Sequence, residues 1–287
     1  MSRPVTFASL QLRPIPFDVE ATVDKLEREA RRLVAAFPQI DLLLFPELYP
    51  TGEDPFGPGE PPGFTERVAE PVPGPLSERL GRLAAGIGRY LVPGSVLERG
   101  TSGAIHNTAI VLGPDGRLLT SYRKLFPWRP HERTVPGDGT GRVIDLPGLG
   151  RVGLLICYDG WFPEVARGLA LDGAEVLLQP TLTTTADREE EIVLARANAI
   201  VNQCYVVNVN ALGSRGGGRS VTVDPEGHVL TELGTQETFS IDVVDLDRVA
   251  QVRERGLRGV SRPWRQLLDE APAAAFEPYR RFLSSAP

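Results

Sequence analysis

Three residues whose side chains could together perform acyl transfer each follow a short apolar run: Glu47, Lys124 and Cys157. The runs contain L-L-L-F, L-L-T-S-Y and G-L-L-I, and their lengths predict buried strands. The carboxyl ends of neighbouring strands can meet at one rim of a sheet. A carboxylate, an ammonium and a thiol at that rim could supply a base, an oxyanion stabiliser and a nucleophile.

Cys157 lies at a predicted strand-to-helix turn. Residues 151–156 form the strand, Asp159-Gly160 the turn, and Pro163-Glu164 the first turn of a helix. The backbone N–H groups of a helix N-terminus lower a thiol pKa, so we expect a reactive thiolate. The alternative is a small buried hydrophobe, which is our interpretation of Cys204 within its apolar run.

Composition limits the class of protein. The 287 residues carry a formal charge of −6, which argues against a nucleic-acid partner. No apolar run has membrane-spanning length, and the N-terminus lacks a signal-peptide pattern, so we expect no membrane association. Two cysteines make no disulfide framework, which favours a reducing cytoplasm. The three histidines are scattered and no Cys/His spacing suits zinc, so no metal site is predicted.

Lysine is rare in this chain. Of 31 basic residues only Lys25 and Lys124 are lysines. Lys25 lies in a charged helical stretch and suits a solvated surface, whereas Lys124 is flanked by Tyr122, Leu125 and Phe126. A compact ammonium retained among arginines indicates a specific task for Lys124.

Strand and helix patterns alternate through most of the chain. We predict strands at 4–12, 40–45, 91–96, 107–112, 118–122, 142–146, 151–156, 175–179, 205–210, 220–224, 228–232 and 238–244, and helices at 18–37, 77–90, 163–172 and 187–202. This order favours an α/β (α+β) fold of two mixed sheets faced by helices. Residues 50–75, 124–138 and the threonines at 183–185 are predicted loops that shape a pocket. We expect one catalytic domain at 1–250, and a C-terminal extension at 251–287 that packs on the body or on a neighbouring subunit.

The three strand-end motifs, F-P-E, Y-R-K and C-Y-D followed by F-P-E, resemble the signature regions of the nitrilase superfamily, the carbon–nitrogen hydrolases. Their order and their spacings of 77 and 33 residues are also similar to that family, as are N-T-A-I-V-L and A-R-A-N-A-I-V-N-Q-C-Y-V-V-N-V-N. The resemblance covers most of residues 5–245. It implies a four-layer α-β-β-α sandwich, a homodimer or higher homo-oligomer, and no cofactor.

The same resemblance places a second glutamate of the family at Glu132. The segment K-L-F-P-W-R-P-H-E looks like the version found in aliphatic amidases and formamidases, and C-Y-D-G-W-F-P-E is also closer to amidases than to nitrilases. Glu132 would then orient Lys124 or the substrate nitrogen. The alternative is a loop charge paired with Arg129 or Arg133.

The expected reaction is hydrolysis of a small carboxamide to an acid and ammonia through a thioester. Glu47 would accept the thiol proton of Cys157, while Lys124 and the backbone N–H of Tyr158 would stabilise the oxyanion. Trp128 and Trp161 could form apolar pocket walls, or could be ordinary core aromatics.

Four other functions stay open from the sequence. The same thioester chemistry would serve a nitrilase, an N-carbamoyl-amide hydrolase or an acyltransferase. A non-catalytic binding protein of the same fold is the alternative from a different class.

Overall fold

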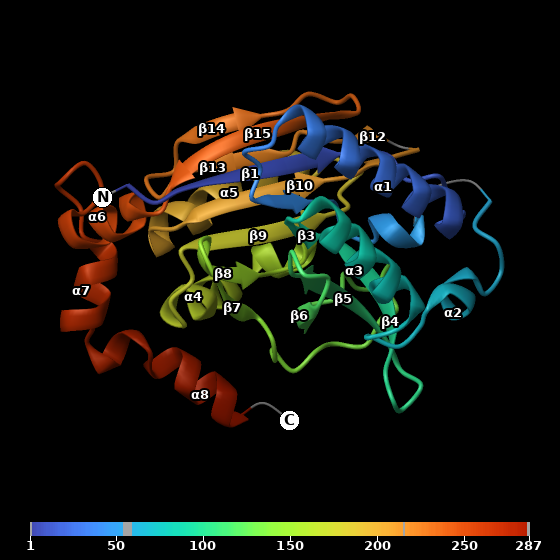
Figure 1. The fold of residues 1–287 in the computed structure, drawn as a ribbon. Helices are drawn as coiled ribbons and strands as arrows, with labels where there is room; N and C mark the ends of the chain where they lie inside the picture. The colour runs from blue at the N-terminus through green and yellow to red at the C-terminus, as the bar shows by residue number, and fades with distance from the viewer. Residues whose placement is uncertain (1, 54–58, 215, 286–287) are drawn as a thin grey trace.

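Two β-sheets stack face to face, and helices cover both outer faces (Figure 1). The structure is a computed structural model that describes residues 2–53, 59–214 and 216–285. The first sheet has the order β15-β1-β2-β3-β5-β4, with β6 also paired to β5. Its strands are β1 (Pro4–Gln11), β2 (Leu42–Leu44), β3 (Tyr90–Val92), β4 (Ser95–Arg99), β5 (Ile105–Leu112), β6 (Leu118–Arg123) and β15 (Thr238–Asp245).

The second sheet has the order β14-β13-β10-β9-β8-β7. Its strands are β7 (Val143–Leu146), β8 (Gly150–Leu154), β9 (Val176–Thr181), β10 (Tyr205–Asn210), β13 (Val221–Val223) and β14 (Val229–Glu232). Strands β8, β9 and β10 are parallel, and the outer strands are antiparallel. A separate two-stranded hairpin joins β11 (Leu212–Gly213) and β12 (Gly216–Gly217). Both main sheets are therefore mixed, as the sequence predicts.

Four helices form the outer layers. Helices α1 (Val19–Ala36) and α3 (Pro75–Ile87) pack on the first sheet, and α4 (Pro163–Leu171) and α5 (Arg188–Asn202) on the second. Helix α1 buries Val23, Leu26, Ala30 and Leu33, which share one face at helical spacing. Asp18 caps the helix by accepting a hydrogen bond from the backbone N–H of Ala21 at 2.9 Å.

The alternation of side chains along each strand divides the core into three layers, one between the sheets and one between each sheet and its helices. In β2, Leu42 and Leu44 face the other sheet, whereas Leu43 packs on the outer helices. In the second sheet, Leu154 faces inward, whereas Leu155 packs under α4 and α5. Strands buried on both faces need continuous apolar runs, which explains L-L-L-F and G-L-L-I. The predicted fold class of two mixed sheets flanked by helices is confirmed.

The prediction of one strand over 91–96 is wrong. Pro93-Gly94 divides it into β3 and β4. Gly94 has φ of 93°, and a Cβ there would lie 1.7 Å from the carbonyl oxygen of Pro46. Only glycine allows this approach. The break in the strand therefore supports the backbone next to Glu47.

The long predicted loop at 50–75 contains short helical turns. A 3₁₀ turn, η1 (Tyr49–Thr51), stands at its start, and α2 (Phe64–Val68) lies within it. Residues 54–58 of this loop lie outside the described residues. Phe64 is buried and its ring meets Phe17 edge-on with centroids 5.2 Å apart, which ties the segment to the body.

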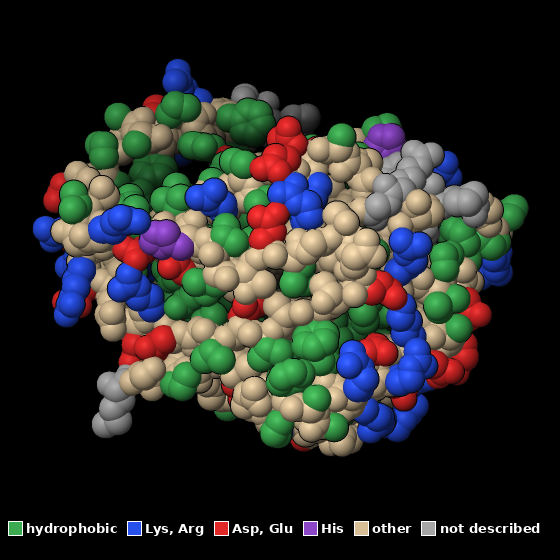
Figure 2. All heavy atoms as spheres, turned by 90° about the horizontal axis from the view of Figure 1, so that it is seen from above, with side chains coloured by type: hydrophobic (Ala, Val, Ile, Leu, Met, Phe, Trp, Pro, Cys, Tyr) green, Lys and Arg blue, Asp and Glu red, His purple; other side chains and the backbone are tan. Residues whose placement is uncertain are grey.

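The chain ends in helices α6 (Asp247–Arg255), α7 (Pro263–Glu270) and α8 (Glu277–Ser285), with a 3₁₀ turn, η3 (Ala273–Ala275), before α8. Trp264 of α7 is buried between the guanidinium groups of Arg167 and Arg253, which lie 5.5 and 4.5 Å from its ring. Beyond it, α8 extends away from the sheets (Figure 1). No helix in the described ranges is both long and apolar enough to cross a membrane. On the face seen in Figure 2, basic and acidic side chains are interspersed.

The inter-sheet core predicts a large stability difference between two substitutions. Leu154 is fully buried between the sheets, whereas Val243 of β15 is 63% exposed. We expect Leu154→Ala to lower the free energy of unfolding by about 2–5 kcal/mol through a cavity. Val243→Ala, the control, should change it by no more than about 0.5 kcal/mol. Denaturant unfolding measures both, and equal effects would contradict the assignment of Leu154 to the core.

Candidate active site

The structure gathers a buried lysine between two glutamates. Glu47 follows β2, Lys124 follows β6, and Glu132 lies on the loop after Lys124. The ammonium Nζ of Lys124 donates to Glu47 Oε1 at 2.8 Å and to Glu132 Oε2 at 2.7 Å. The side chains of Lys124 and Glu47 are 3% and 5% exposed. The alternative prediction, an ion pair between the side chains of Glu132 and Arg129, is wrong. Arg129 donates to the backbone carbonyl oxygens of Glu132 and Thr134 instead.

Burial and mutual charge set the ionisation of these groups. Burial by itself would lower the pKa of Lys124, but the carboxylates around it hold that pKa well above its usual value. Burial raises the pKa of Glu47, and Lys124 offsets part of the rise. The pKa of Glu132 is lowered because Lys124 and four hydrogen bonds outweigh the effect of its burial. Lys124 and Glu132 thus stay charged, and Glu47 is the carboxylate that most readily accepts a proton.

Cys157 completes the cluster from the second sheet. It follows β8 and begins a short 3₁₀ helix, η2 (Cys157–Trp161), with φ of 45°. Its sulfur lies 3.7 Å from Oγ1 of Thr183, and the charges of Glu47 and Lys124 act on the thiol with opposite effects on its pKa. The carbonyl oxygen of Cys157 accepts a hydrogen bond from Gln179 Nε2 at 3.0 Å, which holds the left-handed backbone in place.

The expectation of a lowered thiol pKa is wrong. Burial raises the pKa of Cys157 well above its usual value, and the charge of Glu47 adds to the rise, against the opposing effect of Lys124. A short 3₁₀ helix has few aligned peptide dipoles, and the negative charge of Glu47 disfavours the thiolate. The sulfur therefore rests as a thiol and needs a base to release its proton.

Asp159 ties the cysteine turn to the lysine strand. It is fully buried and accepts hydrogen bonds from the Tyr122 hydroxyl (2.8 Å), the backbone N–H of Ile156 (3.0 Å) and the backbone N–H of Phe126 (2.9 Å). Tyr122 belongs to the first sheet and Asp159 follows the second. This single carboxylate therefore fixes the distance between the two halves of the site.

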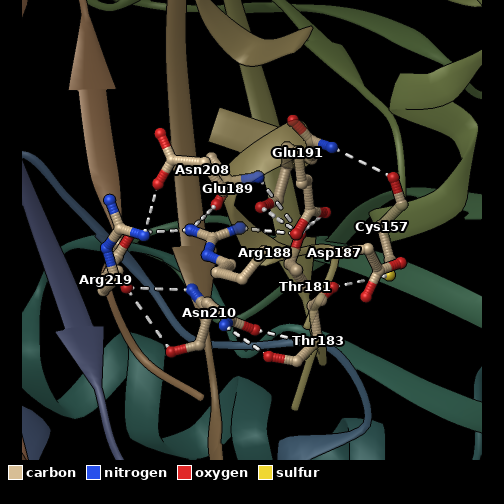
Figure 3. Close-up of polar contacts among 12 residues, drawn as sticks. Cys157, Thr181, Thr183, Asp187, Arg188, Glu189, Glu191, Asn208, Asn210 and Arg219 are labelled. Carbon is tan, nitrogen blue, oxygen red and sulfur yellow. Dashed lines mark hydrogen bonds and ion pairs between the residues drawn. The ribbon is translucent and has the colours of Figure 1, made fainter. Parts of the chain in front are cut away.

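Thr183 contacts the thiol from a loop held by a side-chain amide (Figure 3). Asn210 of β10 accepts from the backbone N–H of Thr183 and donates to its carbonyl oxygen, both at 2.8 Å. Behind this loop, the buried Arg188 donates to Glu191 Oε2 at 2.5 Å and to Asn208 Oδ1 at 2.7 Å. The predicted threonine loop is thus a rigid wall beside the sulfur.

The three remaining predicted site residues lie on the same two loops. Tyr158 is the second residue of η2, and the first N–H groups of a helix have no acceptor within it. Trp161 ends that helix, with its ring 5.9 Å from the ring of Tyr158. Trp128 stacks near His131 at 4.4 Å, and its backbone N–H donates to Glu132 Oε2 at 3.0 Å. The place of Trp128 and Trp161 in a pocket wall stays a prediction.

Four residues of the site were not identified from the sequence: Asn107, Asp159, Gln179 and Glu53. Asn107 lies in the N-T-A-I-V-L strand and Asp159 in C-Y-D, so both stand inside motifs that carry the family resemblance. Glu53 follows Glu47 closely in the sequence, and its hydrogen-bond donor is Thr65 Oγ1 at 3.4 Å. Burial, together with the charges of Glu60, Glu132 and Glu47, raises the pKa of Glu53 to about 8.

A possible metal-ligand cluster lies elsewhere. Within the described ranges, Asp224, Glu226 and His228 in the turn between β13 and β14 are the one group whose ligand atoms come within 4.8 Å of one another. Glu226 already accepts from Arg248 and from the backbone N–H of Arg258. Asp224 accepts from two backbone N–H groups of its own turn, and its second oxygen lies 3.1 Å from Nδ1 of His228. These contacts explain the turn without a cation.

The chain is similar to known carbon–nitrogen hydrolases along most of its length. The profile of the carbon–nitrogen hydrolase family matches residues 6–254. The mouse omega-amidase NIT2 is 33% identical over 264 residues, which cover 86% of this chain and 90% of the relative. A formamidase from Bacillus cereus is 33% identical over 224 residues, which cover 75% and 66% of the two chains.

Solved structures show the same architecture. Nit3 of Saccharomyces cerevisiae, from branch 10 of the nitrilase superfamily, matches with a TM-score of 0.78 and 27% identity over 88% of this chain and 93% of its own. An amidase from Nesterenkonia sp. matches with a TM-score of 0.73 and 28% identity over 87% and 94%. A variant of that amidase carries the acetamide moiety of fluoroacetamide covalently at its active-site cysteine.

The contact between Gly160 and Gln179 generates a testable prediction. A Cβ on residue 160 would lie 2.3 Å from Gln179 Nε2, the atom that holds the Cys157 carbonyl. We expect Gly160→Ala to push Gln179 aside and to lower kcat roughly 10–100-fold. Its unfolding free energy should change little, because the far end of a side chain moves at low cost. Gly234→Ala is the control, since no atom lies within 4 Å of its Cβ position. Full activity of Gly160→Ala would contradict the positioning role of Gln179.

Proposed function

The chain belongs to the carbon–nitrogen hydrolase family, and from this premise we propose that it is an amidase acting on small, uncharged carboxamides. The products are the carboxylic acid and ammonia, and the intermediate is a thioester on Cys157. One observation carries the proposal. Buried Glu47 accepts from the ammonium of Lys124 at 2.8 Å and its charge acts on the thiol of Cys157, so a base, a nucleophile and an oxyanion stabiliser are gathered in one cluster.

Acylation begins with transfer of the thiol proton from Cys157 to Glu47. The sulfur attacks the amide carbon, and the negative charge moves to the carbonyl oxygen. Lys124 spends two of its three N–H groups on Glu47 and Glu132, which leaves one for that oxygen. The backbone N–H of Tyr158 is the second donor. Removal of one such donor typically lowers kcat by ~10²–10³.

The tetrahedral adduct collapses when Glu47 returns its proton to the nitrogen. The C–N bond breaks, ammonia leaves and the thioester remains. A water molecule then gives a proton to Glu47 and its oxygen attacks the thioester carbon. The C–S bond breaks, the acid leaves and the sulfur recovers its proton. One carboxylate, Glu47, moves every proton in this sequence.

Glu132 orients Lys124 rather than the substrate nitrogen. Its Oε2 accepts from Lys124 Nζ at 2.7 Å and from the backbone N–H of Trp128 at 3.0 Å. Its Oε1 accepts from Thr134 Oγ1 at 2.7 Å and from Asn107 Nδ2 at 3.0 Å. These four donors occupy both oxygens, so Glu132 acts as a fixed charge.

The charges around the site favour an uncharged acyl group. Lys124 is already paired with two carboxylates, so it is not free to balance the charge of a substrate carboxylate. A substrate carboxylate would meet like charge in a site of low dielectric. Trp128 and Trp161 would supply the apolar wall beside the reacting carbon. Simple aliphatic amides therefore fit better than amides that carry a second, ionised carboxyl group.

A substrate panel tests the proposed reaction. We expect ammonia from formamide, acetamide or propionamide at a kcat/KM at least about tenfold above that for glutaramate, because the like charges repel. Nitriles, carbamoyl compounds and hydroxylamine as acyl acceptor complete the panel. Intact mass spectrometry should show an acyl adduct that Cys157→Ala lacks, and Cys157→Ala should release no ammonia. Cys204→Ala is the control, since Cys204 lies in the core beneath α5.

Each outcome of the panel has a defined meaning. A preference for glutaramate would overturn the uncharged substrate class but keep the thioester chemistry. Turnover of nitriles or carbamoyl compounds alone would replace the amidase assignment. If no compound of the panel is hydrolysed and no thiol reagent labels Cys157, the binding-protein alternative is favoured.

We also propose that the chain assembles as a homo-oligomer. Apolar side chains are exposed on α5 at Val193 (55%) and Val201 (39%), and on α8 at Leu283 (69%). Covering them in a second copy would remove this area from water. We expect sedimentation equilibrium to give at least twice the chain mass of 31.2 kDa. A mass of one chain at micromolar concentration would contradict the assembly.

A further inference from the structure

Asn107 contacts all three charged residues of the cluster: the carboxylates of Glu47 and Glu132, and the backbone of Lys124. It is fully buried on β5, and its side-chain nitrogen Nδ2 donates to Glu47 Oε1 at 2.8 Å and to Glu132 Oε1 at 3.0 Å. Its backbone carbonyl oxygen accepts from the backbone N–H of Lys124 at 2.8 Å. Both hydrogens of one amide are therefore spent on the two glutamates, and the same residue fixes the start of the lysine loop.

The hydrogen bonds divide the two oxygens of Glu47. Oε1 accepts from both Lys124 Nζ and Asn107 Nδ2, each at 2.8 Å. Among the described residues, Lys124 and Asn107 are the two whose side chains donate to this carboxylate, both to Oε1. Oε2 is thus the oxygen left for the proton. Glu132 has four donors and no such oxygen, so the two carboxylates differ although they share one lysine.

The amide orientation is fixed by these charges. Oδ1 of Asn107 is buried and has no hydrogen-bond partner among the described atoms. A buried acceptor without a donor is costly, and a rotated amide would place Oδ1 against two carboxylates instead. An amide is needed here. An aspartate would place a third carboxylate beside Glu47 and Glu132, and a serine has one O–H donor where the amide has two N–H donors.

We infer that Asn107 is the positioning residue that makes Glu47 the one proton-carrying carboxylate of the site and holds Glu132 as a fixed charge. The inference rests on the proposed thioester chemistry and adds a residue outside the glutamate–lysine–cysteine set. Two N–H donors stabilise the ionised carboxylates, so Asn107 favours the state in which Oε2 of Glu47 is ready to accept the thiol proton.

The test compares Asn107→Asp with wild type in two pH profiles. One is kcat/KM for the best amide, and the other is the rate of alkylation of Cys157 by iodoacetamide, which needs no amide turnover. The variant is nearly isosteric, but it removes a donor and adds like charge beside Glu47. Both changes raise the pKa of Glu47, so the acid limb of both profiles should move to higher pH by at least about one unit. At neutral pH, kcat should fall roughly 10–100-fold with a much smaller change in KM.

Two further variants keep the test decisive. Asn202→Asp is the matched control, because Asn202 is also fully buried with an unpartnered Oδ1 but lies at the end of α5. It should leave both profiles at the wild-type position. Asn107→Ser removes the bridge without adding charge, and it should lower kcat with a smaller shift of the acid limb than Asn107→Asp. If Asn107→Asp does not fold, the same two pH profiles are measured on Asn107→Ser alone.

The outcomes separate the two proposals. If wild type hydrolyses no amide, the proposed function fails, while the alkylation profile still tests Asn107. If the variants only lower the rates and both acid limbs stay at the wild-type pH, Asn107 is a packing residue and the inference is overturned. Shifts of both profiles in Asn107→Asp and, to a smaller extent, in Asn107→Ser, with none in Asn202→Asp, support the positioning role.

Discussion

The site depends on one buried ammonium held between two carboxylates. Removing three charges from water is costly, and the cost is recovered only when every partner is in place. Lys124, Glu47 and Glu132 therefore require the chain around them to be fixed to within a few tenths of an ångström. The close approach of Gly94 to Pro46 and the bond from Lys124 to the Asn107 backbone meet this demand on the first sheet. The polar groups constrain the fold as much as the fold positions them.

The proposed nucleophile, Cys157, comes from the other sheet, so the stacking of the sheets sets the distance between its sulfur and Glu47, the proposed base. The apolar layer between the sheets fixes their separation, but a layer of side chains alone tolerates small slides. Asp159 adds direction, because its carboxylate bonds a tyrosine of one sheet and two backbone N–H groups beside the lysine and the cysteine. Gln179 then holds the left-handed backbone at Cys157. Chemistry at the contact of two sheets thus relies on hydrogen bonds that cross or brace it.

The sequence supports the outline of the fold and the residues at strand ends, because apolar runs and turn residues are local signals. The strand break at Pro93-Gly94 was missed although a Pro-Gly pair is a local turn signal. Its close approach to the carbonyl of Pro46 is a tertiary contact that no local pattern shows. Asn107 and Gln179 stand within strands, where alternation indicates burial but not the partner across the site. The thiol pKa was predicted in the wrong direction because a helix-terminus argument omits burial and the carboxylate of Glu47. Local sequence patterns therefore identify the residues at strand ends, whereas contacts between distant parts of the chain determine their pKa values.

The choice of lysine follows from counting donors. Lys124 satisfies two carboxylates, and in the proposed mechanism it also offers one N–H to a developing oxyanion. An ammonium carries three such groups in a tetrahedral arrangement. An arginine would place its donors in one plane, and its fork would pair with one carboxylate at a time. Only two of the 31 basic residues in this chain are lysines. One of them, Lys124, stands where a single nitrogen must direct its N–H groups to three different partners. In the proposed mechanism the third N–H gives the direction along which substrate charge develops, and the carbonyl must lie on that line to react at Cys157.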